Sequence, residues 1–135
     1  MTYTQQMIET HPAEAVVDTR VLSRCIDACS DCAQSCTACA DACLAEEEVQ
    51  TLVRCIRLNL DCADVCAATG RVLSREVAFE PRLAKPLIEA CAEACRTCAD
   101  ECDRHGEHME HCRVCAAACR ECEQACNELL ASLAA

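Results

Sequence analysis

Residues 25–43 read CIDACSDCAQSCTACADAC and carry six cysteines at successive intervals of 4, 3, 4, 3 and 4 residues. Steps that alternate between three and four keep side chains on one face of an α-helix, whose period is 3.6 residues. The stretch therefore predicts a long helix whose inward face presents sulfur where a helix usually presents leucine.

Three further cysteine rows follow the same rule, over residues 55–66, 91–102 and 112–126, and the second row is the sparsest. The four rows hold all the cysteines of the chain: Cys25, Cys29, Cys32, Cys36, Cys39 and Cys43; Cys55, Cys62 and Cys66; Cys91, Cys95, Cys98 and Cys102; Cys112, Cys115, Cys119, Cys122 and Cys126. Each row is interpreted as one helix.

Breaks are predicted between the rows, at residues 44–48, 75–86 and 103–107, where turn residues replace the periodic pattern. Because these connections are short or moderate, neighbouring helices should run antiparallel. The predicted fold is all-α, an antiparallel up-down-up-down four-helix bundle with a cysteine-lined core. We expect residues 1–135 to form a single four-helix-bundle domain, with residues 1–13 as a tail or a short extra helix.

The charge of the chain excludes several classes of partner. Acidic residues outnumber basic ones by 23 to 12, a net charge of −11, which repels nucleic acid and anionic lipid. No segment approaches the about 18 consecutive apolar residues of a membrane span. Residues 1–18 have neither the basic start nor the apolar run of a secretory signal, so we expect a cytoplasmic protein with reduced thiols.

A row of cysteines admits readings other than metal binding. Buried cysteine can act as a small hydrophobic residue, but 18 of them would fill a core poorly and leave it open to oxidation. Disulfides between residues four apart would strain a helix. Pairs such as Cys29 and Cys32 resemble redox motifs, although a catalytic pair lies at an exposed helix start beside strands, and the chain predicts no strands.

Metal binding uses every sulfur, and Cu(I) suits continuous rows best. Cu(I) prefers thiolate and takes two or three ligands, so that bridging thiolates approach charge neutrality. On that basis 18 thiolates would hold about 18 ions in two-coordinate bridging or about 12 in three-coordinate bridging. Zinc wants four sulfurs at fixed corners, and iron–sulfur clusters want four cysteines converging in loops.

The two ends of the predicted bundle differ. Antiparallel order brings Cys43, Cys55, Cys102 and Cys112 to one end, which we call the histidine end because His105, His108, His111 and Met109 precede or flank the fourth row. Imidazole and thioether bind Cu(I), so His108 and His111 are predicted metal ligands where ions arrive, with His111 the best candidate and His105 the weakest.

The opposite end is predicted to be sealed by apolar residues, and we call it the apolar end. Its predicted members are Val16, Val17, Val21, Leu22, Val72, Leu73, Leu87, Ile88, Leu129, Leu130 and Leu133. Between Cys55 and Cys62 the second row instead carries Leu58 and Asn59, so this stretch should bind fewer ions. Asp61 is interpreted as a solvated surface carboxylate.

The segments CIDACSDCAQSCTACADAC, CAEACRTCADEC and CRVCAAACRECEQAC resemble those of the copper storage proteins, over residues 14–132. The resemblance implies a four-helix bundle in which the 18 cysteines bind many Cu(I) ions and the histidines around Cys112 form the open end. It also implies the cytosolic kind of member, which forms tetramers and carries histidine where exported members carry methionine.

The sequence thus predicts a cytosolic protein that stores and sequesters Cu(I) against copper toxicity and is not an enzyme. The expected partners are copper ions, delivered by a copper chaperone, and further copies of the chain in a homotetramer. Two alternatives stay open: a zinc-buffering protein of the metallothionein type, and a thiol redox protein with one unusually reactive cysteine pair.

Overall fold

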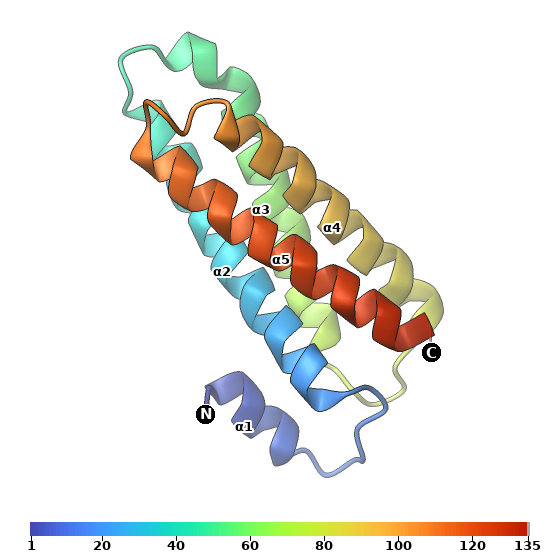
Figure 1. Cartoon of the computed structure of the whole chain (residues 1–135). Helices are drawn as coiled ribbons and strands as arrows, with labels where there is room; N and C mark the ends of the chain where they lie inside the picture. Colours follow the sequence, from blue (N-terminus) through green and yellow to red (C-terminus); the bar gives the residue numbers. More distant parts are fainter. Residues whose placement is uncertain (135) are drawn as a thin grey trace.

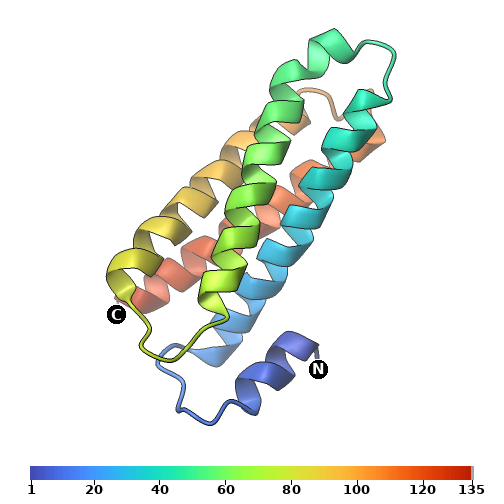
Figure 2. The ribbon, with the colours of Figure 1, turned by 180° about the vertical axis from the view of Figure 1, so that it is seen from behind.

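Residues 1–134 are described by the computed structural model of the chain, and their regular secondary structure is entirely helical (Figure 1). The elements are α1 (Tyr3–Glu9), α2 (Thr19–Leu44), the short 3-10 helix η1 (Val49–Leu52), α3 (Val53–Leu73), α4 (Pro81–Asp103) and α5 (Glu110–Ala134). Helices α2 and α4 each pack against both α3 and α5. Successive long helices run in opposite directions (Figures 1 and 2), which confirms the predicted four-helix bundle.

Acidic side chains cap the starts of two of the long helices. The Asp18 carboxylate accepts hydrogen bonds from the backbone N–H groups of Arg20, at 3.0 Å, and Val21, at 3.2 Å, and so begins α2. The Glu80 carboxylate accepts from the backbone N–H of Arg82 at 3.1 Å and begins α4. Both caps satisfy backbone donors that have no partner within the helix, and they lie ahead of the cysteine rows.

The predicted break at residues 75–86 is wrong at its C-terminal side, because α4 begins at Pro81 and Pro86 lies inside the helix. Pro81 occupies a position where the missing N–H costs nothing and the fixed φ suits a helix. Pro86 does remove a backbone hydrogen bond. The helix continues through it, since Ala84 and Ile88 on either side are buried in the bundle core.

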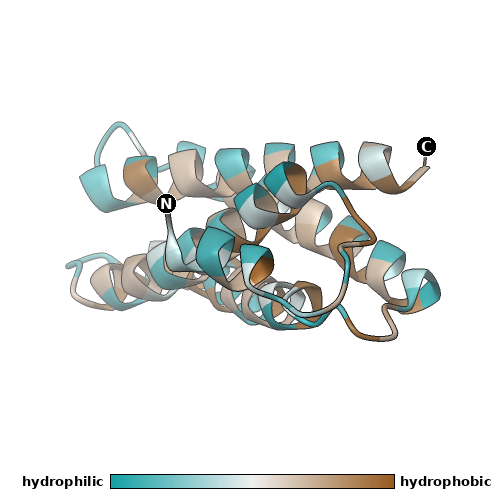
Figure 3. Ribbon diagram, turned by 90° about the horizontal axis from the view of Figure 1, so that it is seen from below, coloured by the Kyte–Doolittle hydropathy of each residue, from teal (hydrophilic) through white to brown (hydrophobic). Residues whose placement is uncertain are grey.

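Polar and apolar residues alternate around each helix, as Figure 3 shows, so that one face of each helix is available to the core. At the apolar end, Leu22, Leu73, Ile88 and Leu129 are at most 3% exposed and close the core. Val16 was predicted to join them, which is wrong: it is 68% exposed, because it precedes α2 in the connection from α1.

The first residues of the chain form α1, which packs against α2 near the apolar end (Figures 1 and 2). The hydroxyl of Thr4 donates a hydrogen bond to the Asp27 carboxylate at 2.6 Å and ties the short helix to the bundle. Of the helices within residues 1–134, none combines the length and the apolarity that crossing a membrane requires.

Candidate metal centre

All 18 cysteines lie in the core of the bundle as free thiols, each at most 2% exposed. Sulfurs from different helices are in contact: Cys36 Sγ lies 3.5 Å from Cys119 Sγ, and Cys66 Sγ lies 3.6 Å from Cys95 Sγ. These separations are far longer than the about 2 Å of a disulfide bond. The core is therefore a column of reduced sulfur supplied by four helices.

The sulfurs gather into overlapping groups of four rather than into separate sites. Within each group the sulfur atoms all lie within 4.8 Å of one another. Four such groups are Cys29, Cys91, Cys122 and Cys126; Cys32, Cys66, Cys95 and Cys122; Cys32, Cys36, Cys62 and Cys119; and Cys36, Cys98, Cys115 and Cys119. Each group shares at least one cysteine with the next, so a metal in one group has ligands in common with a metal in its neighbour.

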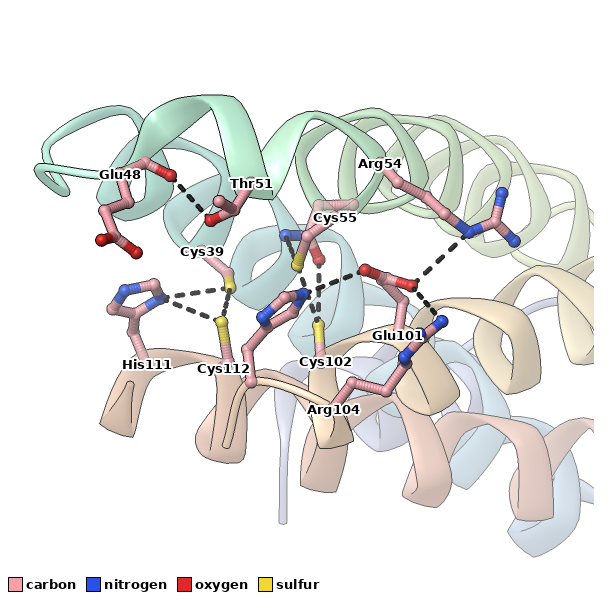
Figure 4. A network of polar contacts seen from close by, with 12 residues as sticks. Cys39, Glu48, Thr51, Arg54, Cys55, Glu101, Cys102, Arg104, His111 and Cys112 are labelled. Carbon is pink, nitrogen blue, oxygen red and sulfur yellow. Dashed lines mark hydrogen bonds and ion pairs between the residues drawn. The ribbon is translucent and has the colours of Figure 1, made fainter. Parts of the chain in front are cut away.

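At the histidine end, a further group combines imidazole with sulfur. It comprises Cys39, Cys43, His111 and Cys112, again with ligand atoms within 4.8 Å of one another. The Nδ1 atom of His111 lies 3.4 Å from Cys39 Sγ and 3.6 Å from Cys112 Sγ (Figure 4). His111 is 27% exposed, so this group is both next to solvent and in contact with the sulfur column.

The other residues singled out from the sequence lie farther from sulfur. His108 is exposed in the connection between α4 and α5, and His105 Nε2 lies 3.0 Å from the Glu101 carboxylate. Met109 is partly buried against the core. The Asp61 carboxylate is exposed and accepts hydrogen bonds from the Arg57 guanidinium, as expected of a surface ion pair.

Asn59 lies in the sulfur column, and its contacts were not foreseen. Its amide oxygen accepts hydrogen bonds from the thiols of Cys98, at 3.0 Å, and Cys115, at 3.2 Å, and its Nδ2 lies 3.7 Å from Cys55 Sγ. The side chain is fully buried, whereas Leu58 beside it is only half-buried. The spacing of the second cysteine row predicts that Asn59 faces the core. The sequence does not indicate which thiols the Asn59 amide contacts there.

A buried carboxylate stands beside this end of the column. Glu101 is 6% exposed and faces two guanidinium groups, with Arg54 Nε at 3.5 Å and Arg104 Nη1 at 3.6 Å (Figure 4). The ion pairs join α3 to the end of α4, immediately beside Cys102. They compensate the charge of Glu101, which would otherwise be costly to bury.

Contacts among thiols shift their acidity in opposite directions. Hydrogen bonds from Cys126 and Cys29 lower the pKa of Cys25 to about 5, whereas burial raises the pKa of Cys43. Hydrogen bonds from Cys102 and Cys39, together with the nearby His111, lower the pKa of Cys112. Neighbouring thiols therefore differ in acidity, and each thiol that binds metal as a thiolate must first lose its proton.

The fold and the site together define a helical bundle whose core offers soft thiol ligands in groups that share cysteines and could hold metal ions. A sequence profile of the copper storage protein family matches residues 18–131. The chain belongs to the copper storage protein family, and the resemblance stated from its cysteine rows is confirmed.

Solved structures of similar proteins agree. The copper storage protein of Streptomyces lividans loaded with 10 copper equivalents is 52% identical, with a TM-score of 0.94, and the match covers 96% of this chain and 98% of that one. A cytosolic copper storage protein from Streptomyces lividans with five coppers is 56% identical, with a TM-score of 0.82, and the match covers 83% of this chain and 93% of that one.

A more distant structure has the same fold. The apo form of copper storage protein 3 from Bacillus subtilis is 34% identical, with a TM-score of 0.67, over 79% of this chain and 96% of that one. Among curated proteins, no sequence matches the chain.

The difference between the two ends predicts an order of thiol reactivity. In the reduced, metal-free protein, iodoacetamide should modify Cys112 at least about tenfold faster than Cys126. Cys112 contacts the partly exposed His111 and hydrogen bonds from Cys102 lower its pKa, whereas Cys126 is fully buried at the apolar end and hydrogen bonds from Cys122 raise its pKa. Mass spectrometry of peptides after timed quenching measures the rates. Labelling in urea supplies the unfolded reference, and equal rates at the two ends of the folded protein would contradict the prediction.

Proposed function

We propose that the chain stores and sequesters Cu(I) in the cytosol, holding many ions on its core cysteines and thereby limiting copper toxicity. The observation that carries the proposal is the sharing of cysteines between adjacent groups, such as Cys122 and Cys32. Shared thiolates allow a chain of bridged ions, which is the arrangement that two- or three-coordinate Cu(I) adopts with sulfur.

Charge favours Cu(I) over zinc in this core. A zinc ion with four unshared thiolates retains a charge of −2, and such a charge would have to be buried repeatedly along the column. Bridged Cu(I) ions approach one per thiolate and leave the core nearly neutral. Glu101 is itself an anion paired with Arg54 and Arg104, and the neutral amide of Asn59 lies toward the histidine end, so neither offsets a negative charge repeated along the column.

The proposed ligands are the 18 cysteines, with His111 as an additional ligand at the histidine end. His111 contacts the sulfurs of Cys39 and Cys112 and is partly exposed, so it can receive an ion and pass it to thiolates by ligand exchange. His108 is proposed as an outer residue at the same end. At the apolar end, the fully buried side chains of Leu129 and Ile88 close the core.

A storage role involves no substrate turnover, and we propose that the protein is not an enzyme. The CxxC pairs, such as Cys29 with Cys32, are buried in the middle of helices and in contact with further thiols. A catalytic thiol pair needs an accessible thiolate instead.

The cytosolic assignment is supported by the relative described as cytosolic and by the free thiols of the core. We propose that a copper chaperone delivers ions at the histidine end, where the partly exposed His111 contacts Cys39 and Cys112.

Anaerobic titration of the reduced protein with Cu(I), against the coloured chelator bathocuproine disulfonate, tests the function. The plateau should lie between about 12 and about 18 ions per chain, because bridging thiolates set that ratio. Replacing two shared cysteines, in Cys32→Ser with Cys122→Ser, should lower the plateau. Ser23→Ala, a buried change outside the sulfur column, should leave it unchanged. Saturation near about four or five ions, or displacement of copper by zinc, would favour discrete tetrahedral sites and overturn the proposal.

The two histidines can be separated by the rate of uptake. We expect His111→Ala to slow transfer of the first ions from the chelator by about 10-fold or more, since a group beside the receiving thiols is lost. His108→Ala should have a smaller effect, because this side chain is exposed in the connection. Stopped-flow loss of the chelator colour gives both rates. Uptake by His111→Ala at the wild-type rate would remove His111 from the route.

We also propose a homotetramer. The exposed apolar side chains of Val53 and Leu60 on α3 and of Val114 on α5 would be its contact points. Size-exclusion chromatography with light scattering should give the mass of four 14.6 kDa chains. A mass of one chain at micromolar concentration would contradict the tetramer and leave copper storage within the single bundle unaffected.

A further inference from the structure

Glu46 is the residue that fixes how His111 faces the sulfur column. Its carboxylate Oε2 lies 2.9 Å from His111 Nε2, while the opposite ring nitrogen, Nδ1, faces Cys39 and Cys112. The contact joins the connection after α2 to the start of α5, across 65 positions of the sequence. The imidazole is thus held between a carboxylate and two sulfurs.

The backbone of Glu46 is hydrogen-bonded to Cys43, a member of the group that contains His111. Its backbone N–H donates to the carbonyl of Cys43 at 3.2 Å, in the turn that ends α2. Cys43 belongs to the same group as His111, Cys39 and Cys112. Movement of the carboxylate relative to this group would therefore disturb the end of α2.

The chemistry of the two ring nitrogens gives the contact its consequence. A carboxylate accepts hydrogen bonds, so the 2.9 Å contact places an imidazole proton on Nε2. In the neutral ring, the lone pair of Nδ1 then points at the sulfurs of Cys39 and Cys112. Rotation of the ring by half a turn would put a carbon atom toward the sulfurs and would break the bond to Glu46.

A second histidine and carboxylate pair at the same end serves as a comparison. His105 Nε2 lies 3.0 Å from Glu101, but in residues 1–134 the polar contact of this ring is with a carboxylate and not with a thiol. Of the two pairs, only the one formed by Glu46 and His111 bridges the solvent side to the sulfur column. Glu46 is therefore not simply one of many acidic residues on an acidic surface.

We propose that Glu46 is a positioning residue for copper uptake, which orients His111 so that its Nδ1 lone pair completes the receiving group with Cys39, Cys43 and Cys112. The proposal rests on the proposed function, since it assigns the means by which the first Cu(I) ion is received. Glu46 does not contact the ion and acts only through His111. Outer partners of this kind typically change metal affinity or activity about 10- to 100-fold when removed.

The test compares Glu46→Ala with Glu47→Ala, which removes the same charge from the adjacent, exposed position. In the metal-free wild type, long-range ¹H–¹⁵N NMR at a single pH should show His111 with its proton on Nε2 and an unprotonated Nδ1. Glu46→Ala should shift both ring nitrogen resonances, and Glu47→Ala should leave them in place. Circular dichroism checks that each variant keeps the helical content of the wild type.

Uptake kinetics provide the second measurement. Glu46→Ala should slow the first phase of Cu(I) transfer from bathocuproine disulfonate by about 10-fold or more, with the final capacity of the cysteine column retained. In a His111→Ala background, Glu46→Ala should have no further effect on the rate, because Glu46 is proposed to act only through His111. Unchanged ring resonances, an unchanged first phase, or full additivity with His111→Ala would each overturn the proposal. Failure of the wild type to bind Cu(I) at all would instead overturn the storage function.

Discussion

Contact between thiols of different helices is the interaction on which the rest of the bundle depends. Sulfurs such as Cys36 and Cys119 approach to 3.5 Å only because short side chains line the facing surfaces. Buried alanines, among them Ala99 and Ala125, flank the cysteines and allow the backbones to come close. A core of leucine would hold the helices farther apart. The small side chains of cysteine and alanine therefore set the close helix spacing that brings the sulfurs into contact.

The proposed storage of metal and its proposed uptake fall at different places along the bundle. Along the column, overlapping groups of cysteine provide a continuous, apolar and buried set of soft ligands. At the histidine end the surroundings become polar, with Asn59, Glu101 and His111 close to the last sulfurs. Buried thiolates disfavour exchange with solvent, whereas a partly exposed imidazole permits it, and the two properties reside at different places on the same axis.

The rows of cysteine were sufficient to predict the four helices, their antiparallel order and the gathering of all 18 thiols in one core. The period of the pattern carries that information without any knowledge of tertiary contacts. Local signals failed at Pro86, where burial of the neighbouring Ala84 and Ile88 outweighs the cost of proline, and at Val16, which the chain path leaves outside the core. Glu46 was indistinguishable from its acidic neighbours, since its partner His111 is distant in sequence and is brought near only by folding.

Overlap between the groups also determines how damage would spread. Cys32 and Cys122 each belong to two groups, so they act as nodes in a network rather than as members of independent sites. Oxidation of one such sulfur removes a ligand from two neighbouring groups at once. The same connectivity would let an ion displaced from one group bind to an intact thiolate in the next. Loss of one cysteine would therefore redistribute the ions among neighbouring groups.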